Sequence, residues 1–335
     1  MFKALLKSSK MSMRAIQVKE FGASWVMQLV PDVKKPIPEK NEVLVEMKYS
    51  GVNPVDTYIR SGSYAVLPQL PYIPGKDGAG VIAQVGNAVK KFKVGDRVFV
   101  EQSGRHGTLA EFAAVHEDRT YLLPENLNLE QGAALAIAAF TAYRALHLKG
   151  GARKGHRVLV HGASGSVGQA AVQLARAAGL HVVGTAGTAE GEEVVLQCGA
   201  AAVYNHRRPG YLDELKAKES EGFDIVLEML SNVNLGNDLS LLRRRSVVVV
   251  VGCRGEVTIS PRLLMANEAS IVGCAPSAAD EEEAASTAAA VIQAVQKGQL
   301  VPRVSKIYTL EQASQAHDDV INNPSLGKLI VDVTA

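Results

Sequence analysis

The sequence predicts an α/β protein in which a β-rich domain is joined to a domain built on a doubly wound parallel sheet. Residues 13–136 alternate short apolar runs with proline and glycine, which is typical of β-strands and tight turns. From residue 155 onward, apolar runs alternate with helical patterns, as in a parallel sheet with right-handed crossovers. At the start of this second region, residues 157–187 combine a strand, a glycine-rich turn, a helix and a second strand.

The glycine-rich turn at residues 162–168 is the most informative motif. It follows an apolar strand at 157–161 and precedes an alanine-rich helix that extends to about Ala178. The missing Cβ lets the backbone approach phosphates at Gly165 and lets helix and strand pack closely at Gly168. Free N–H groups at the helix start attract negative charge, so the turn can hold a dinucleotide pyrophosphate. The G-x-x-G-x-x-G spacing is less specific than G-x-G-x-x-G, and a glycine turn in a non-binding α/β domain is the alternative.

The same periodicities predict further elements. In the β-rich region the expected strands are residues 15–18, 42–47, 80–85 and 97–100, and an alanine-rich helix around 133–146 joins the two domains. In the second region strands are expected at 180–185, 201–204, 223–228, 247–251 and 269–273, and a helix at 284–297. A short helix at 311–322 leads to a tail strand at 326–333. Periodicity leaves open whether this tail returns to the first domain or extends the parallel sheet.

Composition describes an ordinary globular chain. The 335 residues suffice for two domains, and 47% hydrophobic with 21% charged residues is typical of such proteins. A net charge of +2 gives no electrostatic footprint for nucleic acid, and no apolar run approaches the eighteen residues of a membrane span. Cys198, Cys253 and Cys274 form no C-x-x-C pair, which argues against a structural zinc lobe and a disulfide framework.

The first twelve residues, MFKALLKSSKMS, are basic, with no acidic residue before Glu20. We expect residues 1–12 to be a disordered extension, because the segment lacks arginine and is short for a transit peptide. A mitochondrial presequence is the alternative. The expected location is therefore cytoplasmic, with a mitochondrial location as the second reading.

The end of the second strand of the dinucleotide unit indicates which cofactor it takes. Dinucleotide folds usually place an acid there for the adenine ribose. In this chain the residues from 183 to 189, where that strand ends, contain no Asp or Glu, and the next acid is Glu190. The third strand then delivers Asn205, His206, Arg207 and Arg208, whose donor and cationic groups can bind a 2′-phosphate. This pattern favours NADPH over NADH, with an ordinary solvated loop as the alternative for the two arginines.

Five segments carry a resemblance to a known family. They are YSGVNPVDTYIRSG at 49–62, LPYIPGKDGAGVI at 70–82, FTAYRAL at 140–146, VLVHGASGSVG at 158–168 and VLEMLSNVNL at 226–235. Together the segments resemble the NADPH:quinone reductases related to zeta-crystallin, a zinc-free branch of the medium-chain dehydrogenase/reductase superfamily. The resemblance implies a GroES-like domain of residues 13–137 and 306–335, with a Rossmann NADPH-binding domain of residues 138–305 inserted between, and so returns the tail to the first domain.

The resemblance also implies the site residues. Together with Arg207, the residues expected at the NADPH site are Tyr58, Thr141, Ser164, Gly165, Ser166, Val167, Gly187, His206, Asn234, Val251, Gly252, Cys253, Arg254, Cys274, Ala275 and Pro276. Thr141 is expected beside the nicotinamide ring, and Asn53 and Tyr64 on the substrate side. Tyr58 and Tyr64 have core or rim aromatics as their alternative. No residue is assigned as an obligatory general acid, because positioning of hydride donor and acceptor is expected to be the protein's main contribution.

Two positions indicate that the resemblance is to the zinc-free branch. Zinc-dependent relatives have a cysteine where this chain has Asn53, and a histidine where it has Lys76. Neither side chain replaces a zinc ligand, so we expect no metal. Without a Lewis acid to stabilise an alkoxide, alcohol oxidation is not expected, whereas a quinone is already electrophilic.

Two further positions depart from the family pattern. Arg245-Ser246 replaces a usual Gly-Gly pair, so we expect the backbone there to adopt a conformation permitted to residues with a Cβ. Cys274-Ala275-Pro276 also departs, and Pro276 has no N–H to offer a ligand.

The function predicted from these features is NADPH-dependent quinone reduction, with ortho-quinones favoured and one-electron transfer to a semiquinone left open. The alternative with the same cofactor is reduction of a 2-alkenal or enone. A second-class alternative, which the family suggests, is binding of AU-rich RNA or a structural crystallin role, although the chain shows no RNA-recognition motif. The family also suggests a homo-oligomer, either tetramer or dimer.

Overall fold

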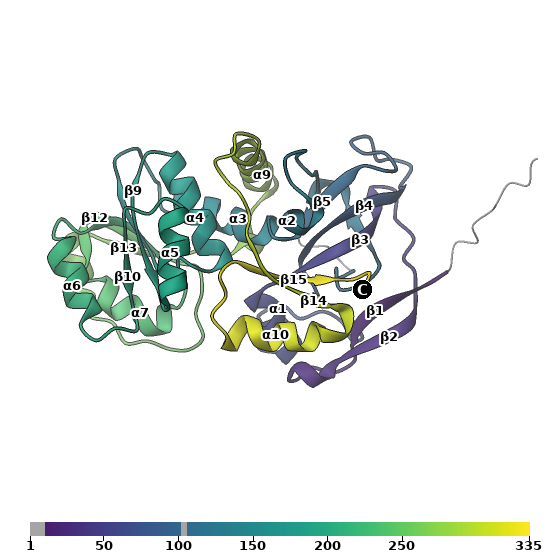
Figure 1. The fold of residues 1–335 in the computed structure, drawn as a ribbon, viewed down its shortest axis with the longest axis horizontal. Helices are drawn as coiled ribbons and strands as arrows, with labels where there is room; N and C mark the ends of the chain where they lie inside the picture. Colours follow the sequence, from purple (N-terminus) through teal and green to yellow (C-terminus); the bar gives the residue numbers. More distant parts are fainter. Residues whose placement is uncertain (1–10, 102–105) are drawn as a thin grey trace, which may run out of the picture. The chain divides into compact units, whose positions relative to one another are not determined.

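The computed structural model describes residues 11–101 and 106–335, which form two compact units (Figure 1). One unit takes in the described residues up to Leu123 together with Lys306–Asn323 and Leu329–Ala335. The other comprises Pro124–Ser305 and Pro324–Lys328, so it begins before the expected boundary at residue 138. Most of the expected extension, residues 1–10, lies outside the described residues, and Ser12 already belongs to a strand.

The first unit is organised around strand β3 (Glu42–Val52), whose Val43, Val45 and Met47 are fully buried in its core. In the described part of the chain its main sheet has the order β14-β15-β3-β4-β5-β7, and β6 also pairs with β3. The tail strand β15 runs antiparallel to β3, so the C-terminus returns to this unit.

The strands that the apolar runs predict in the first unit are present, but they are longer or shorter than predicted. The strands are β1 (Ser12–Val18), β2 (Met27–Lys34), β4 (Asp77–Val85), β5 (Arg97–Glu101), β6 (Phe112–His116), β7 (Thr120–Leu122), β14 (Val304–Thr309) and β15 (Lys328–Asp332). The helices are α1 (Pro54–Ser61) and α10 (Ala313–Asn322). Strands β1 and β2 form a separate antiparallel pair.

The second unit is a doubly wound sheet of parallel strands in the order β10-β9-β8-β11-β12-β13. The strands are β8 (Arg157–Val160), β9 (His181–Ala186), β10 (Ala202–Asn205), β11 (Phe223–Glu228), β12 (Leu242–Val250) and β13 (Ser270–Gly273). Chain order reverses between the neighbours β8 and β11, which is the switch point of this topology. The predicted fold class is confirmed.

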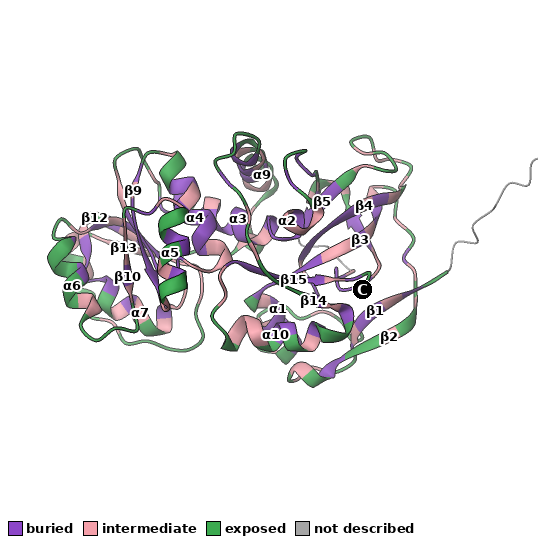
Figure 2. Cartoon of the chain, in the orientation of Figure 1, coloured by how far each residue is buried: buried purple, intermediate pink, exposed green. Residues whose placement is uncertain are grey.

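The described helices of this unit pack either on the sheet or on one another. They are α2 (Leu129–Ala133), α3 (Ala136–Tyr143) with a π-helical extension Arg144–Lys149, α4 (Ser166–Ala177), α5 (Ala189–Gln197), α6 (Tyr211–Lys218), α7 (Ser231–Asp238), α8 (Pro261–Asn267) and α9 (Glu281–Gln296). Figure 2 shows buried and exposed faces on α5, while the strands behind it are largely buried. Within the described residues, no helix is both long enough and apolar enough to cross a lipid bilayer.

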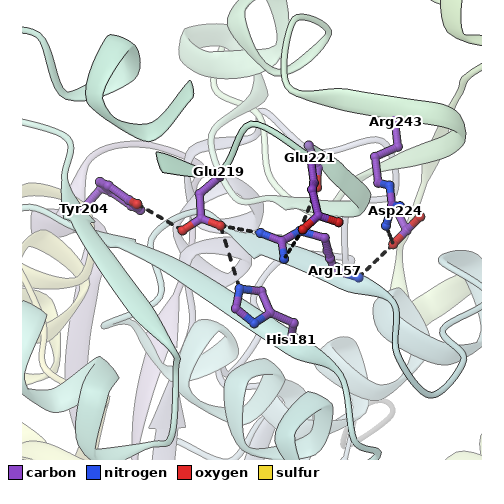
Figure 3. Close-up of polar contacts among 8 residues, drawn as sticks. Arg157, His181, Tyr204, Glu219, Glu221, Asp224 and Arg243 are labelled. Atoms are coloured by element: carbon purple, nitrogen blue, oxygen red, sulfur yellow. Dashed lines mark hydrogen bonds and ion pairs between the residues drawn. The ribbon is translucent and has the colours of Figure 1, made fainter. Parts of the chain in front are cut away.

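Ion pairs tie the amino ends of the parallel strands together (Figure 3). Arg157 at the start of β8 pairs with Glu219 and donates its backbone N–H to Asp224 of β11 at 2.8 Å. Tyr204 donates its hydroxyl to Glu219 at 3.0 Å, and burial together with this contact raises the pKa of Tyr204 to about 12. Arg243 of β12 lies 3.2 Å from Asp224. The cations and carboxylates of the amino edge therefore pair with one another and hold the ends of these strands in place.

The backbone at Arg245 contradicts the expectation from sequence. Its φ is +61°, in the left-handed region that residues with a Cβ usually avoid. The strand β12 starts at Leu242 rather than near 247, and its register against β11 jumps between Leu242 and Val247. The intervening residues form a bulge that needs a left-handed residue, and Arg245 occupies it while its side chain reaches Glu268 at 3.2 Å.

We therefore predict that Arg245→Gly stabilises the protein by about 0.5–1 kcal/mol in urea unfolding, because glycine removes the left-handed strain. Arg244→Gly is the matched control, since Arg244 is exposed like Arg245 and pairs with the same Glu268, but has an ordinary φ. The control is expected to destabilise by about 0.5–1 kcal/mol, because glycine weakens a strand. Equal losses in both variants would contradict this account of the bulge.

Candidate functional site

The candidate site lies at the carboxyl edge of the second unit's sheet, at the switch point between β8 and β11. The glycine-rich turn follows β8, and the segment 229–234 follows β11. In doubly wound sheets ligands bind in the crevice outside this point, because the loops after the two strands diverge to opposite faces. Most of the residues expected at the dinucleotide site belong to loops on this edge.

The glycine turn has the geometry that an anion site needs. A Cβ at Gly168 would lie 2.5 Å from the carbonyl oxygen of Gly162 and 2.6 Å from the Cα of Ala163, so helix α4 packs on the turn only with glycine there. At Gly165 the nearest atom to an added Cβ would be 3.4 Å away, which is ordinary contact. The fold therefore requires Gly168, whereas Gly165 keeps space open on the ligand side.

The start of α4 supplies the hydrogen-bond donors. The helix begins at Ser166, and Gly165 at its N-cap makes no side-chain capping bond. The expected residues Ser164, Gly165, Ser166 and Val167 are all half-buried around this turn. The first N–H groups of a helix have no intrahelical acceptors, so they can bind the oxygens of a phosphate.

Three residues expected at the adenosine end come together after β9 and β10. A Cβ on Gly187 would lie 2.9 Å from Nε2 of His206 and 3.0 Å from Nε of Arg207. The neighbouring Arg208 is paired with Glu192 at 2.9 Å, while the guanidinium of Arg207 has no ion-pair partner among the described residues. Arg207 is therefore a cation available beside the position where a dinucleotide fold holds the adenine ribose.

The loops after β11 and β12 are tied to each other. The N–H of Ser231 donates to the carbonyl of Gly252 at 2.9 Å, and the N–H of Arg254 donates to Oδ1 of Asn232 at 2.9 Å. A Cβ at Gly252 would lie 2.3 Å from the carbonyl oxygen of Met229, so only glycine fits. The expected residues Val251, Gly252, Cys253, Arg254 and Asn234 thus lie on one edge, and the thiol of Cys253 is exposed there.

The remaining expected residues of this unit are buried or held by hydrogen bonds to other parts of the unit. Thr141 is buried in α3, with 4% of its surface exposed. Cys274 is also buried and donates its N–H to Val250 at 2.9 Å, within the sheet. The carbonyl of Ala275 accepts a hydrogen bond from Arg144 at 2.6 Å, and Pro276 opens the short helical turn Pro276–Ala278.

Three expected residues belong to the first unit: Asn53 and Tyr64, expected on the substrate side, and Tyr58, expected at the NADPH site. Asn53 directly precedes α1 and is buried, and its Nδ2 donates to Asp77 at 2.7 Å and to Asp56 at 3.2 Å. Tyr58 on α1 and Tyr64 just after it are half-buried. Asn53 is therefore held by two carboxylates, which fixes its amide orientation at the start of the helix.

A buried group of ionisable side chains at the switch point was missed by sequence reasoning. His161 follows β8, Glu228 ends β11 and Asp238 ends α7, and one ligand-type atom of each lies within 4.8 Å of the others. Nε2 of His161 lies 2.9 Å from Oδ1 of Asp238. The available signal was an acid closing an otherwise apolar strand, but only the parallel pairing of β8 with β11 brings it beside the histidine.

Comparisons with known proteins agree with this architecture. Two family models match, "Alcohol dehydrogenase GroES-like domain" over residues 39–125 and "Zinc-binding dehydrogenase" over residues 166–291. A quinone oxidoreductase from Mus musculus is 50% identical over 323 residues, covering 95% of this chain and 97% of that protein. The structure of Escherichia coli quinone oxidoreductase complexed with NADPH aligns with a TM-score of 0.86 at 29% identity, covering 96% of this chain and 100% of that one. An NAD-dependent alcohol dehydrogenase structure aligns at 0.89 with 26% identity, again covering 96% and 100%.

The two glycines of the turn give a test of the site. We predict that Gly165→Ala weakens dinucleotide binding about tenfold or more, because the added methyl group occupies the ligand side, while stability changes by less than about 0.5 kcal/mol. Gly168→Ala is expected to lose about 1–3 kcal/mol of stability, because its Cβ overlaps backbone. Fluorescence titration with a dinucleotide and thermal unfolding separate the two effects. Unchanged dinucleotide affinity in Gly165→Ala would exclude the turn as the binding site.

Proposed function

Since this chain belongs to the quinone oxidoreductase family of the medium-chain dehydrogenase/reductase superfamily, we propose that it reduces quinones with NADPH as hydride donor. The mouse and human relatives named quinone oxidoreductase each cover 95% of the chain at 50% and 48% identity. The related E. coli structure is of a complex with NADPH.

The observation that carries the choice of NADPH is the adenosine end of the site. Strand β9 ends at Ala186 without an acid, and Arg207 lies beside Gly187 with no ion-pair partner among the described residues. A carboxylate there would repel a 2′-phosphate, whereas a guanidinium binds it through charge-assisted hydrogen bonds. His206, next to the same glycine, offers a further ring nitrogen.

The other residues bind and orient. The glycine turn and the start of α4 hold the pyrophosphate, and the loops after β11 and β12 line the same edge of the sheet. Thr141, Cys274, Ala275 and Pro276 are proposed around the nicotinamide, Tyr58 is proposed at the NADPH site, and Asn53 and Tyr64 on the substrate side. NADPH supplies the hydride, so the protein's contribution is to align donor and acceptor and to exclude water.

We propose that the reaction needs no zinc, although one matching family model is described as zinc-binding. Asn53 and Lys76 stand where zinc-dependent relatives have cysteine and histidine, and the amide nitrogen of Asn53 is already bonded to Asp56 and Asp77. A quinone accepts a hydride without a Lewis acid because the negative charge of its product is delocalised. Ortho-quinones are the proposed substrate class.

Selective weakening of NADPH binding tests the proposal. Arg207→Ala is expected to raise the Kd for NADPH about 10- to 100-fold, the value of one or two charge-assisted hydrogen bonds, with little change for NADH. Arg208→Ala is the matched control, because Arg208 already forms an ion pair with Glu192. Fluorescence titration with both cofactors measures the affinities. Equal loss for NADPH and NADH would show that Arg207 does not contact the 2′-phosphate.

Steady-state kinetics identify the acceptor. With NADPH, kcat/KM is expected to be highest for ortho-quinones and low for a 2-alkenal, without added metal. Comparable efficiency on the alkenal would favour the enone reductase reading. Activity that is lost with a chelator and restored by zinc would exclude the zinc-free reaction.

We also propose that the protein forms a homo-oligomer. Strand β13 is the outermost strand of its sheet in the described part of the chain, and Met265 on the adjacent α8 is 78% exposed. An open sheet edge with apolar neighbours is suited to pairing with a second copy. Light scattering of the purified protein measures its mass.

A further inference from the structure

Three ionisable side chains are buried together beneath the glycine turn. Glu228 and Asp238 have no exposed surface, and His161 is 3% exposed. Nε2 of His161 lies 2.9 Å from Oδ1 of Asp238 and 3.8 Å from Oε2 of Glu228. One carboxylate oxygen of Glu228 and one of Asp238 lie within 4.8 Å of each other. We call these three residues the switch-point cluster.

The charges of the cluster do not balance by themselves. Two carboxylates and one imidazolium leave a net charge of −1 in a region without solvent. Oε2 of Glu228 and Oδ2 of Asp238 are both buried acceptors without a hydrogen-bond donor among the described residues. One additional proton, shared between the two carboxyl groups, neutralises the cluster and supplies the missing donor.

The surroundings favour that proton at neutral pH. Burial raises the pKa of Glu228 to about 7. The negative charge of Asp238 also raises it, whereas the positive charge of His161 lowers it. Burial opposes a charged His161, but the hydrogen bond that it donates to Asp238 and the charges of the two carboxylates keep its pKa above the ordinary value.

The other ionisable groups that face the cluster are uncharged. Tyr211 at the start of α6 is neutral because burial and the two carboxylates raise its pKa. His206 after β10 is neutral because burial, His161 and Arg207 lower its pKa. The only described cation among these neighbours is therefore Arg207, which acts on His206 rather than on the carboxyl pair.

The cluster is bonded to both loops that flank the switch point. Oε1 of Glu228 accepts hydrogen bonds from the N–H of Leu230 at 2.5 Å and from Nδ2 of Asn234 at 3.2 Å. On the other side, Nδ1 of His161 lies 3.2 Å from Oγ1 of Thr185.

Thr185 completes the connection to the glycine turn. Its Oγ1 also accepts the N–H of Gly162 at 3.2 Å, and its carbonyl accepts the N–H of Ala163 at 2.8 Å. A change in the cluster's protonation is thus transmitted through single hydrogen bonds to the first residues of the turn.

We propose that His161, Glu228 and Asp238 are positioning residues that store a proton beneath the dinucleotide site and couple NADPH binding to proton uptake. The inference rests on the proposed binding of NADPH. The phosphates of the cofactor bring negative charge to the turn above the cluster, so binding favours its neutral, protonated form. By linkage, the protonated form binds the cofactor more tightly.

The direction with pH follows from the raised pKa of Glu228. The shared proton is bound below pH of about 7 and is lost as the pH rises through that value. NADPH affinity is therefore highest on the acid side and falls on the alkaline side. A binding-induced rise of one pKa unit corresponds to about a tenfold change in Kd across the transition.

Calorimetric titration with NADPH in two buffers of different ionisation enthalpy measures the protons taken up on binding. Wild-type protein at pH 7.5 is expected to take up a measurable fraction of one proton per site. Glu228→Gln is expected to take up less and to bind NADPH at pH 8.5 more tightly than wild type does, since glutamine mimics the protonated acid. Because the 2′-phosphate itself titrates near a pH of about 6, the difference between the variant and wild type is the informative quantity.

Glu219→Gln is the matched control, because Glu219 is also a buried carboxylate of this unit but lies at the amino edge of the sheet (Figure 3). It is expected to leave proton uptake unchanged. Equal uptake and equal pH dependence in wild type, Glu228→Gln and Glu219→Gln would overturn the inference.

Infrared spectra of the protein without NADPH test the stored proton separately. A protonated carboxylic acid band that is present at pH 6, absent at pH 9 and missing in Asp238→Asn supports the cluster. The absence of such a band in wild type overturns it, even if NADPH binds. Failure of NADPH to bind wild type at any pH, with the band present, rejects the proposed cofactor instead. If the purified protein contains one zinc ion per chain and His161→Ala loses it, the cluster is a metal site rather than a proton store, and the inference is overturned.

Discussion

The close approach of Gly168 to the backbone of Gly162 and Ala163 is the contact on which the carboxyl edge depends. It lets α4 begin within a few residues of β8, so the free N–H groups at the start of the helix face the space above the switch point. The residue between β8 and this turn, His161, is buried and lies 2.9 Å through Nε2 from Oδ1 of Asp238. The turn that Gly168 permits therefore lies between the proposed anion site and the buried cluster that contains His161.

The two edges of the parallel sheet use charge in opposite ways. At the amino edge, Arg157 and Glu219 lie within a closed network in which cations and carboxylates face one another. At the carboxyl edge, Glu192 forms an ion pair with Arg208. Arg207, which lies beside Gly187, has no ion-pair partner among the described residues. Paired charges fix strand ends, whereas a cation without an ion-pair partner can only be satisfied by water or a ligand. This difference between the two edges supports the proposed dinucleotide site at the carboxyl edge.

Sequence reasoning succeeded where structure is local. Apolar periodicity gave the strands of the second unit to within a few residues, except for β12, and the glycine spacing located the turn. It was wrong at Arg245, because a bulge depends on the register between β11 and β12, which no local pattern encodes. The tail strand stayed ambiguous for the same reason, since its partner β3 lies almost the whole chain away.

The switch-point cluster escaped detection because its members are distant in sequence. His161 and Glu228 are brought together by the pairing of β8 with β11, and Asp238 by the packing of α7. By contrast, Gly187 and Arg207 could be grouped in advance, because the end of the second strand of a dinucleotide unit has a known role. Sequence therefore predicts sites whose residues follow consecutive strands better than sites that depend on strand order.

Burying three ionisable groups inside a sheet carries a desolvation cost that apolar side chains would avoid. Replacing such groups by apolar residues of similar size often gains about 1–4 kcal/mol, so their presence is not explained by stability alone. At Glu228, however, an apolar side chain would leave the N–H of Leu230 and the amide of Asn234 without their acceptor. Once Glu228 is retained, its Oε2 and Oδ2 of Asp238 are both buried without a hydrogen-bond donor among the described residues, and two neighbouring carboxylates in a dry interior disfavour each other's ionised form. The hydrogen bonds that shape the loop after β11 therefore already commit this site to holding a proton, and the turn above it lies close enough to sense whether the proton is there.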